Sequence, residues 1–436
     1  DQAEQADQAD QAGHPRSGGQ RLLVRAGKDP LTPMSAERSL SVRHDGVFGT
    51  NAGNMLFYTA AWRTLLAEGV ELVADGYATE RQRPRRAVAR IGDGFDRFVI
   101  PLANAFRPSF VPQLDRLTEV IRRLDVPVSV LGVGAQFRFR EGIDSAPDDL
   151  RTSVRAFVAA VLDRSPSIGV RGEFTREFLL DLGFGDDQID VIGCPSLYGF
   201  GRLAGFQGAP GAIAPKSGLD ERSALAVTYS PYLRDIGPFV AQVTQEFPNS
   251  FVVPQTVEAL ALMLEGRPTR YAAKTDLPES PEHGLYRADR MRFFVDATTW
   301  IDGLRDRDLV VGTRIHGTIA GLLAGVPSIL IAHDSRTREL AEFHAIPHRS
   351  KGALRKVDVA RWYERADFDA FTARHPANVA TFRAFLERHG LAHTLGEERP
   401  RFDRELAATT LAEPVRVNPD PRRPRSRVLA RLLTRR

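Results

Sequence analysis

The chain has 436 residues, with 59 basic and 55 acidic side chains and a formal net charge of +4. This length suggests two or three domains, and a hydrophobic fraction of 42% with a charged fraction of 26% excludes collagen, mucin, coiled-coil and fully disordered classes. Because residues 415–436 alone hold eight Arg against one Asp, the basic excess belongs to a tail, and we expect no nucleic-acid partner for the rest of the protein.

The chain begins with four [DE]-Q-A triplets, and we predict that residues 1–40 form a disordered, low-complexity segment. Apolar runs of strand length then alternate with amphipathic runs of helix length, which indicates an α/β fold with parallel sheets. Most strand-like runs are continuously apolar, as in strands buried on both faces. The predicted strands are Phe98–Leu102, Val128–Val133, Ser167–Val170, Ile189–Ile192, Ala224–Tyr229, Phe251–Pro254, Leu309–Val311 and Ser328–Ile331.

Composition divides this alternation into two domains. Residues 200–221 are rich in Gly, Ala and Pro and are interpreted as a linker. They separate a first α/β domain, residues 41–199, from a second, residues 222–350. Residues 351–412 are predicted to be helical and to pack across both domains, and residues 413–436 form a basic tail.

The strongest motif leads from a predicted strand into a helix. Thr313 follows the strand, Arg314 and His316 lie where the helix begins, and Gly317 removes side-chain bulk. Ligands of open α/β sheets bind beyond the carboxyl ends of strands, and a helix start attracts anions. Arg offers a planar donor fork to phosphate or carboxylate, and His transfers protons near neutral pH. The alternative is a salt-bridged Arg314 and a hydrogen-bonded, buried His316.

A second motif is a loop that opens a predicted helix. Gly49 and Gly53 bracket Asn51, and backbone amides in such a loop can surround an anion. The loop lacks the G-K-[ST] of a phosphate-binding Walker loop. Capping of the helix by Asn51 or Asn54 explains the residues equally well.

Two further segments follow predicted strands. Glycines in Gly132–Gln136 permit the close approach of a ligand, or simply of a neighbouring part of the chain. Arg171 directly follows its strand and is a candidate for a second anion contact. An ordinary ion pair with Glu173 or Glu177 is the alternative.

Metal binding is not expected. The D-x-D at residues 306–308 precedes its strand, on the wrong side of the sheet for a ligand site. Pro347 interrupts the His344/His348 pair, and no carboxylate pattern accompanies His389/His393. We therefore predict no metal site.

Taken together, these segments resemble the polysaccharide pyruvyl transferase family. The correspondence extends over about residues 45–350, and its most specific part is the late T-R-x-H-G. Asn54 departs from the family pattern, which has Asp there, so no carboxylate function is expected at that position. The matching segments are Asn51-Ala52-Gly53-Asn54, Gly132-Val133-Gly134, Gly169-Val170-Arg171 and Thr313-Arg314-Ile315-His316-Gly317.

The resemblance implies a fold similar to the two-domain glycosyltransferases of the GT-B type, with two Rossmann-like domains facing across a cleft. It also implies transfer of the pyruvyl group of phosphoenolpyruvate, a co-substrate, to sugar hydroxyls as a ketal, without a cofactor. Two arginines would hold the donor's anionic groups, and His316 would transfer the proton. The residues assigned to the donor are Arg171, Arg314, Thr313, Gly317, Asn51 and Gly53.

Polar residues at or near other predicted strand ends are candidates for binding the acceptor, a glycan or lipid-linked sugar. The same residues are suited to capping loops. They are Asn104, Gln136, Tyr229, Ser230, Gln255, His333 and Asp334.

Two other functions stay open at this point. A nucleotide-sugar-dependent glycosyltransferase of the same GT-B-type shape would need a carboxylate for the ribose, and Glu258 is the candidate. A non-catalytic scaffold of a polysaccharide assembly complex would not need the R-x-H-G segment.

Location follows from the cysteine count and the ends of the chain. Cys194 is the single cysteine, which excludes an intrachain disulfide, and no signal-peptide pattern is present, so we expect a cytoplasmic protein. Near the C-terminus, four apolar residues share one helical face between arginines. Peripheral attachment of residues 415–436 to an anionic membrane is therefore our hypothesis, with a solvated tail as the alternative.

Overall fold

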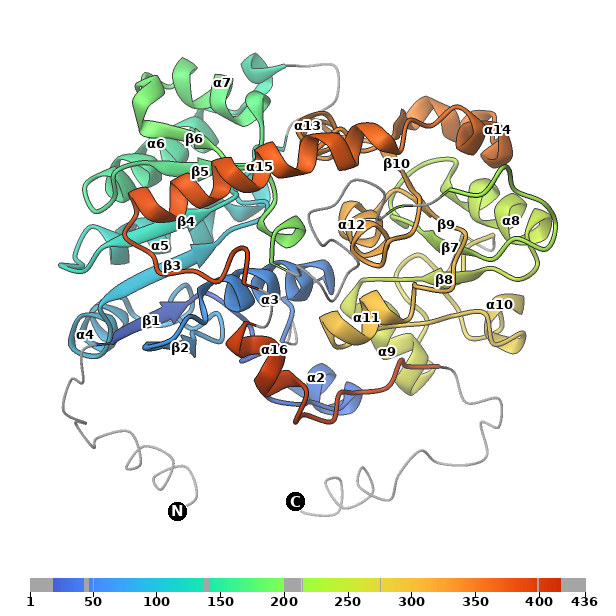
Figure 1. Cartoon of the computed structure of the whole chain (residues 1–436), viewed down its shortest axis with the longest axis horizontal. Helices are drawn as coiled ribbons and strands as arrows, with labels where there is room; N and C mark the ends of the chain where they lie inside the picture. Colours follow the sequence, from blue (N-terminus) through green and yellow to red (C-terminus); the bar gives the residue numbers. More distant parts are fainter. Residues whose placement is uncertain are drawn as a thin grey trace.

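A computed structural model describes residues 19–42, 47–49, 51–136, 142–199, 213, 215–274, 276–397 and 400–416. It contains two α/β halves, each with a parallel sheet (Figure 1). In the first half four strands pair in the order β2-β1-β3-β4, and β5 pairs with β6. A bridge between Val133 and Val170 connects the two groups. The strands are β1 (Gln20–Val24), β2 (Val70–Ala74), β3 (Arg97–Pro101), β4 (Val128–Leu131), β5 (Ile168–Val170) and β6 (Ile189–Val191).

Helices on both sides cover this first sheet. Those of more than one turn are α2 (Ala36–Ser41), α3 (Gly53–Leu65), α4 (Pro84–Gly94), α5 (Val111–Ile121), α6 (Asp148–Leu162) and α7 (Glu173–Asp181). In α6, apolar side chains spaced three and four residues apart face the core, and Leu150, Val154, Phe157 and Val161 are fully buried.

The second half has five parallel strands in the order β11-β10-β9-β7-β8. Its strands are β7 (Leu225–Thr228), β8 (Phe251–Val253), β9 (Leu309–Gly312), β10 (Ser328–Ala332) and β11 (His348–Ser350). Its helices are α8 (Ile236–Glu246), α9 (Val257–Glu265), α10 (Gly284–Arg287), α11 (Ala297–Asp302), α12 (Ile315–Leu323) and α13 (Ser335–Phe343).

The strand orders explain where a ligand would bind. In both halves the first strand of the sheet lies between the second and the third, as in doubly wound Rossmann-like folds. In the second sheet the order of the strands changes direction between β7 and β9. Doubly wound folds bind ligands at such a point, beyond the carboxyl ends of the strands. The predicted fold class, two Rossmann-like α/β domains, is confirmed.

The predicted disordered segment is wrong for its second part. Residues 20–24 form β1, which lies between β2 and β3, and Leu22, Leu23 and Val24 are at most 1% exposed. Residues 36–41 form α2. The strand escapes prediction because it is short and follows a polar, Gly-containing stretch. Residues 1–18 lie outside the described residues, as do residues 200–212 and 214 of the predicted linker.

The C-terminal region contains α14 (Val359–Glu364), α15 (Asp369–Arg388) and α16 (Arg401–Leu406). Figure 1 shows α15 running from the second half to the first. Asn378 in its middle donates a hydrogen bond to His344, at the end of α13, and His389 just after it meets Ser129 of β4 at 3.1 Å. In α16, Asp403 accepts hydrogen bonds from Arg63 of α3. This region therefore contacts both halves.

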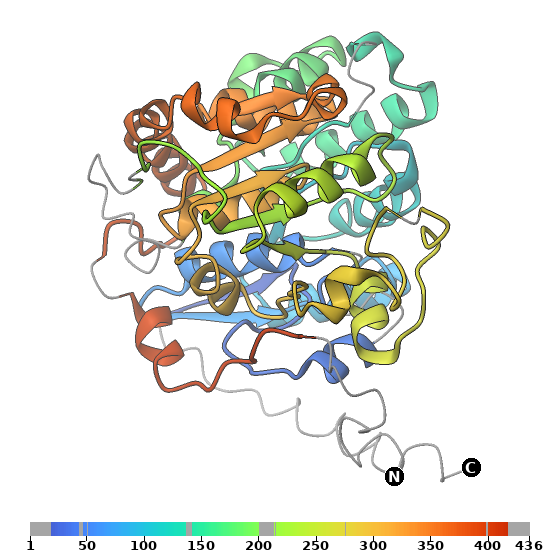
Figure 2. The same ribbon diagram turned by 90° about the vertical axis from the view of Figure 1, so that its right-hand side faces the viewer.

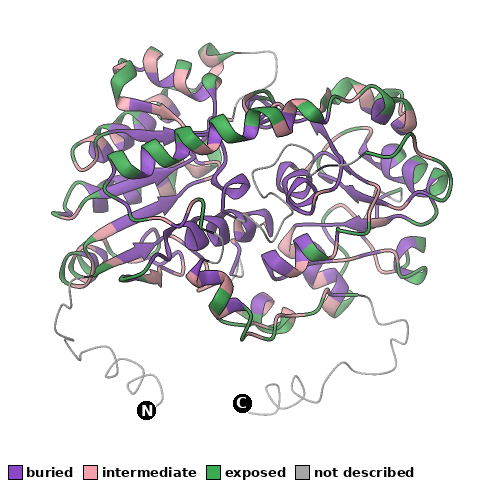
Figure 3. Cartoon of the chain, in the orientation of Figure 1, coloured by how far each residue is buried: buried purple, intermediate pink, exposed green. Residues whose placement is uncertain are grey.

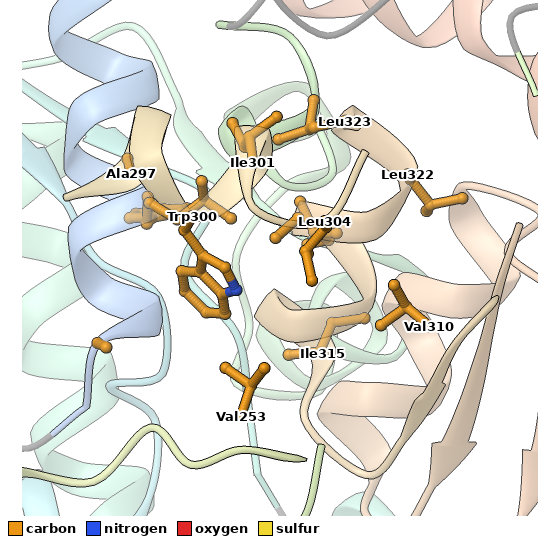
Figure 4. Packing of buried hydrophobic residues seen from close by; sticks show 14 of the residues in the cluster. Val253, Ala297, Trp300, Ile301, Leu304, Val310, Ile315, Leu322 and Leu323 are labelled. Atoms are coloured by element: carbon orange, nitrogen blue, oxygen red, sulfur yellow. The ribbon is translucent and has the colours of Figure 1, made fainter. Parts of the chain in front are cut away.

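Apolar packing also joins the halves. Trp300 and Ala297 of α11 lie against α3, and Ile315 and Leu323 of α12 continue the same cluster (Figure 4). Figure 3 shows α3 and α12 almost wholly buried, whereas one side of α15 faces solvent. Figure 2 shows the second half from its outer side, with the yellow-green helix α8 in front of the strands of its sheet. No helix within the described ranges combines the length and apolar composition that crossing a bilayer needs.

Candidate active site

The late motif occupies the junction between β9 and α12. Gly312 ends β9 with φ of 151°, and a Cβ there would collide with the Thr228 backbone of β7. Arg314 has extended backbone and caps α12, and its Nε donates to the carbonyl oxygen of Tyr229 at 3.0 Å. Gly317 lets α12 approach its neighbours, because a Cβ there would lie 2.6 Å from Thr228 Cγ2. Arg314 is thus held at the carboxyl ends of β7 and β9.

His316 lies in the first turn of α12 and is 6% exposed. Its ring packs against Gly53 at the start of α3, where a Cβ would lie 2.8 Å from His316 Cγ. Burial, together with the charges of Arg171, Arg336 and Arg314, holds the pKa of His316 well below 6.5. The imidazole is therefore neutral at physiological pH, and its Nε2 has no hydrogen-bond partner among the described residues.

Arg171 enters the same site from the first half. It follows β5, is fully buried, and donates from Nε and one terminal nitrogen to the carbonyl oxygen of Gly132, both at 3.0 Å. Burial lowers its pKa to about 10, so it remains charged at neutral pH. Gly134 makes room for it, since a Cβ there would lie 2.7 Å from Arg171 Nε. The glycines of residues 132–134 therefore allow neighbouring parts of the chain to pack closely.

The predicted alternative for Arg171, an ion pair with Glu173 or Glu177, is not found in the structure. Glu173 pairs instead with Arg176 at 3.3 Å, and Arg176 also pairs with Asp186. The remaining terminal nitrogen of Arg171, Nη1, is buried and has no partner within the described residues.

Other polar atoms around these side chains share that property. Each is buried at or near the carboxyl end of a strand and finds no hydrogen-bond partner in the described part of the chain. A buried polar group left unpaired costs roughly 1–3 kcal/mol, so such atoms are uncommon and indicate a place for a polar ligand. They are Asn104 Oδ1, Thr228 Oγ1, Ser230 Oγ, Gln255 Nε2, Thr313 Oγ1, His333 Nδ1 and Arg336 Nε.

The loop that opens α3 connects the halves. The side-chain oxygen of Asn51 accepts from the amide of Gly53 at 2.7 Å, and the side-chain amide of Asn54 donates to the carbonyl of Phe48. The N-cap of α3 is Ala52, so neither asparagine occupies the capping position. Asn51 also forms an antiparallel bridge with Thr256, and Ala52 donates to the carbonyl of Gln255. The loop reaches the site through Gly53, which accommodates His316.

A second polar connection contains three of the predicted acceptor residues. Asn104 donates to Gln136 at 2.6 Å, and Gln136 donates to Asp334 at 3.0 Å. Asp334 caps α13 by accepting from the Thr337 amide. Burial opposes its ionisation, but Arg336, His333 and the bonds from Thr337 lower its pKa to about 2. Asp334 is therefore a charged link between the two halves.

The other predicted acceptor residues have different surroundings. Tyr229 is 2% exposed and its hydroxyl donates to Glu279, while Ser230 and Gln255 are buried near Arg314. His333 contacts the hydroxyl of Tyr232 at 3.0 Å. Burial lowers the pKa of His333 to about 4, against the opposing charge of Asp334.

Residues considered for other functions lie elsewhere. Glu258 forms an ion pair with Arg270 at 3.1 Å in an exposed position. In the D-x-D, Asp306 pairs with Arg307, and Asp308 accepts from the amide of Ala224. Within the described ranges, no group of three or more His, Cys, Asp or Glu side chains is placed to hold a metal ion.

Comparison with known proteins bears on the arginines and histidine of this site. The model of the polysaccharide pyruvyl transferase family matches residues 51–335, which include the loop before α3, Arg171 and the segment from Thr313 to Gly317. The chain belongs to the polysaccharide pyruvyl transferase family. A search of curated proteins gave no match.

Solved structures with a similar chain path were also found. UDP-N-acetylglucosamine 2-epimerase from Rickettsia bellii is 10% identical, with a TM-score of 0.44 over 85% of this chain and 96% of that one. UDP-GlcNAc 2-epimerase from Neisseria meningitidis, bound to UDP-GlcNAc, is 10% identical, with a TM-score of 0.43 over 84% and 99% of the two chains.

Sequence reasoning assigns no role to a third arginine near this site. Arg336 lies in the first turn of α13, and its charge affects the pKa of Arg171, Arg314 and His316. Its contact with Asp334 is long, at 3.4 Å. The available signal was its position shortly after a buried strand, which is the position that Arg314 has after β9.

Proposed function

We propose that the protein transfers the pyruvyl group of phosphoenolpyruvate to hydroxyls of a polysaccharide or glycan precursor and forms a pyruvate ketal. The observation that carries the proposal is the set of buried, unpartnered polar atoms around Arg171, Arg314 and Arg336. Phosphoenolpyruvate carries a phosphate and a carboxylate on a small frame, and guanidinium groups bind both. A small donor with these two anionic groups would give the buried polar atoms hydrogen-bond partners and so remove the free-energy cost of leaving them unpaired.

The donor's phosphate suits the start of α12. Arg314 lies there, and the hydroxyls of Thr313 and Thr228 and the amide nitrogen of Gln255 are free to contact oxygen atoms. The helix start adds a partial positive charge. Arg171, from the opposite half, is then our assignment for the carboxylate, with Arg336 between the two.

The reaction balances without a cofactor. Carbon C3 of the donor gains a proton and becomes a methyl group, while C2 forms a bond to a first sugar oxygen. A second sugar oxygen then bonds to C2 as the C2–O bond to phosphate breaks. Of the two hydroxyl protons, one ends on C3 and the other leaves with phosphate.

His316 is our candidate for moving the first of these protons. Its neutral imidazole is ready to accept a hydroxyl proton. The bound anions would offset the arginine charges that depress its pKa, so the imidazolium forms and donates to C3. The positive site then stabilises the departing phosphate.

Phosphate release from phosphoenolpyruvate, measured with a panel of methyl pyranosides and lipid-linked sugars, tests the proposal. We expect release with at least one acceptor, and His316→Ala should lower the rate about a hundredfold or more. His348→Ala, an exposed histidine of β11, is the control and should behave as the wild type. Near-normal release by His316→Ala would remove His316 from the mechanism, and glycosyl transfer from a UDP-sugar would favour the glycosyltransferase instead.

A further inference from the structure

Tyr232 differs from the other large apolar side chains of the described residues, because it is the one that is exposed, at 48%. It follows β7 in the loop that leads to α8, on the same edge of the second sheet as Arg314. The Arg314 guanidinium lies 5.9 Å from the centre of its ring. The exposed ring therefore borders the proposed donor site.

Its backbone and its side chain are both held in place. Leu233 donates to Ser230, which closes a turn around Tyr232. The ammonium of Lys274 donates to the carbonyls on either side, of Pro231 at 2.6 Å and of Leu233 at 3.1 Å. The hydroxyl of Tyr232 meets His333 Nε2 at 3.0 Å. Because the ring is already fixed, binding a ligand to it would cost little free energy for ordering the side chain.

A polar path connects this ring to the first half: Tyr232 meets His333, the neighbouring Asp334 accepts from Gln136, and Gln136 accepts from Asn104. The phenol of Tyr232 acts electrostatically on Arg107 as well as on Arg314. Arg107 Nε is buried and has no hydrogen-bond partner within the described ranges, and the same holds for Asn104 Oδ1, three residues before it. The path from the exposed ring thus ends at an unpaired acceptor, and an arginine of the same loop leaves a buried donor unpaired.

We propose that Tyr232 is the platform on which a pyranose ring of the acceptor stacks, with Arg107 and Asn104 hydrogen-bonding its hydroxyls. This inference rests on the proposed function, because it places the acceptor beside the donor's anion site. A pyranose has an apolar C–H face and a rim of hydroxyls, which matches an aromatic ring edged by polar groups. A protein partner would instead require a broader apolar patch.

Saturation-transfer NMR with the methyl β-pyranosides of glucose, galactose, mannose and N-acetylglucosamine tests the platform. We expect the wild type to bind at least one of them. Tyr232→Ala should weaken that binding about tenfold, whereas Tyr232→Phe keeps the ring and should bind nearly as the wild type does. Arg107→Gln should also weaken binding. Phe184→Ala, a partly exposed aromatic residue after α7, is the control and should have no effect.

The thermal shift caused by phosphoenolpyruvate separates the two proposals. We expect Tyr232→Ala to keep the shift while losing pyranoside binding. Unchanged pyranoside binding by Tyr232→Ala, or no binding of any of the four sugars by the wild type, would overturn the platform. Absence of a phosphoenolpyruvate shift in the wild type would count against the proposed function instead.

Discussion

Arg171 requires small residues beside its side chain. Its buried side chain occupies the space in which Gly134 would carry a Cβ, and its guanidinium donates two hydrogen bonds to one carbonyl, that of Gly132. A charged side chain at this depth needs such partners, because desolvation opposes its charge. The glycines that follow β4 are therefore part of the site without contacting a ligand themselves.

Gly134→Ala tests that relation. The added methyl group has to displace the Arg171 side chain, so we expect a loss of about 1–3 kcal/mol in the free energy of unfolding. The stabilisation by phosphoenolpyruvate should also disappear. Urea unfolding and thermal shift measure the two effects.

Gly92→Ala is the matched control for this substitution. Gly92 lies in α4 with nothing within 4 Å of a built Cβ, so Ala should be neutral or stabilise by up to about 1 kcal/mol. An undiminished phosphoenolpyruvate shift in Gly134→Ala would contradict the role given to Arg171.

Sequence alone predicted Arg171, Arg314 and His316 because each lies at a strand end within its own half. Glu339 and Tyr232 escape such reasoning for a different reason. Their partners lie about a hundred or more positions away in the sequence, as when Tyr232 meets His333 and Glu339 of α13 meets Thr175 of α7 at 2.9 Å. No local pattern specifies how the two halves face each other.

Strands, too, divide into those with a local sequence pattern and those that depend on distant parts of the chain. Strands β3, β4, β7 and β9 are predicted because continuous apolar runs are typical of strands buried on both faces. In contrast, Glu71 interrupts the apolar run of β2, which reads VELVA and is partly exposed, and the edge strand β11 reads HRS and has no apolar residue. The five residues of β1 give only a weak local signal for a strand, and pairing with β2 and β3 stabilises the strand.

Helices α7 and α13 connect the halves through a carboxyl group. Glu339 is 4% exposed and accepts from the amide of Thr175 at 3.0 Å. Burial raises its pKa from 4.5 to about 8, although Arg171 and the bonds from Thr175 oppose the rise. An acid whose pKa is higher in the folded state contributes most stability below pH 4.5, and that contribution declines as the pH rises towards 8.

Glu339→Gln removes this titration. The free energy of unfolding of the wild type should fall between pH 5 and pH 8.5. In the variant this fall should be smaller by about 1–3 kcal/mol. Urea unfolding at the two pH values measures the difference. Glu342→Gln, on the same helix but half-exposed beside Arg338, should follow the wild type. Identical pH dependence of wild type and Glu339→Gln would refute the assignment.

At the scale of the whole molecule, the candidate site belongs to neither half alone. Arg171 comes from the first sheet, Arg314 and His316 come from the second, and Gly53 packs against His316 across the boundary. The polar link from Gln136 to Asp334 and the helix α15 hold the halves together around it. Binding of the donor should therefore depend on residues from both halves equally.

The basic C-terminal tail adds a prediction at this scale. Residues 417–436 lie outside the described residues, and their attachment to anionic membranes stays a prediction. A chain truncated after Arg416 should float less with vesicles that contain phosphatidylglycerol, and equally with neutral vesicles. Phosphate release with a water-soluble acceptor should not change. Equal flotation of both chains with anionic vesicles would end the hypothesis.

We propose that three arginines from two halves form a site for a small donor with phosphate and carboxylate groups. Calorimetric titration with phosphoenolpyruvate tests it most directly. We predict saturable binding by the wild type, weakened about tenfold or more by Arg171→Met and by Arg314→Met alike. Heat from UDP but none from phosphoenolpyruvate, or full donor affinity in both variants, would contradict the account.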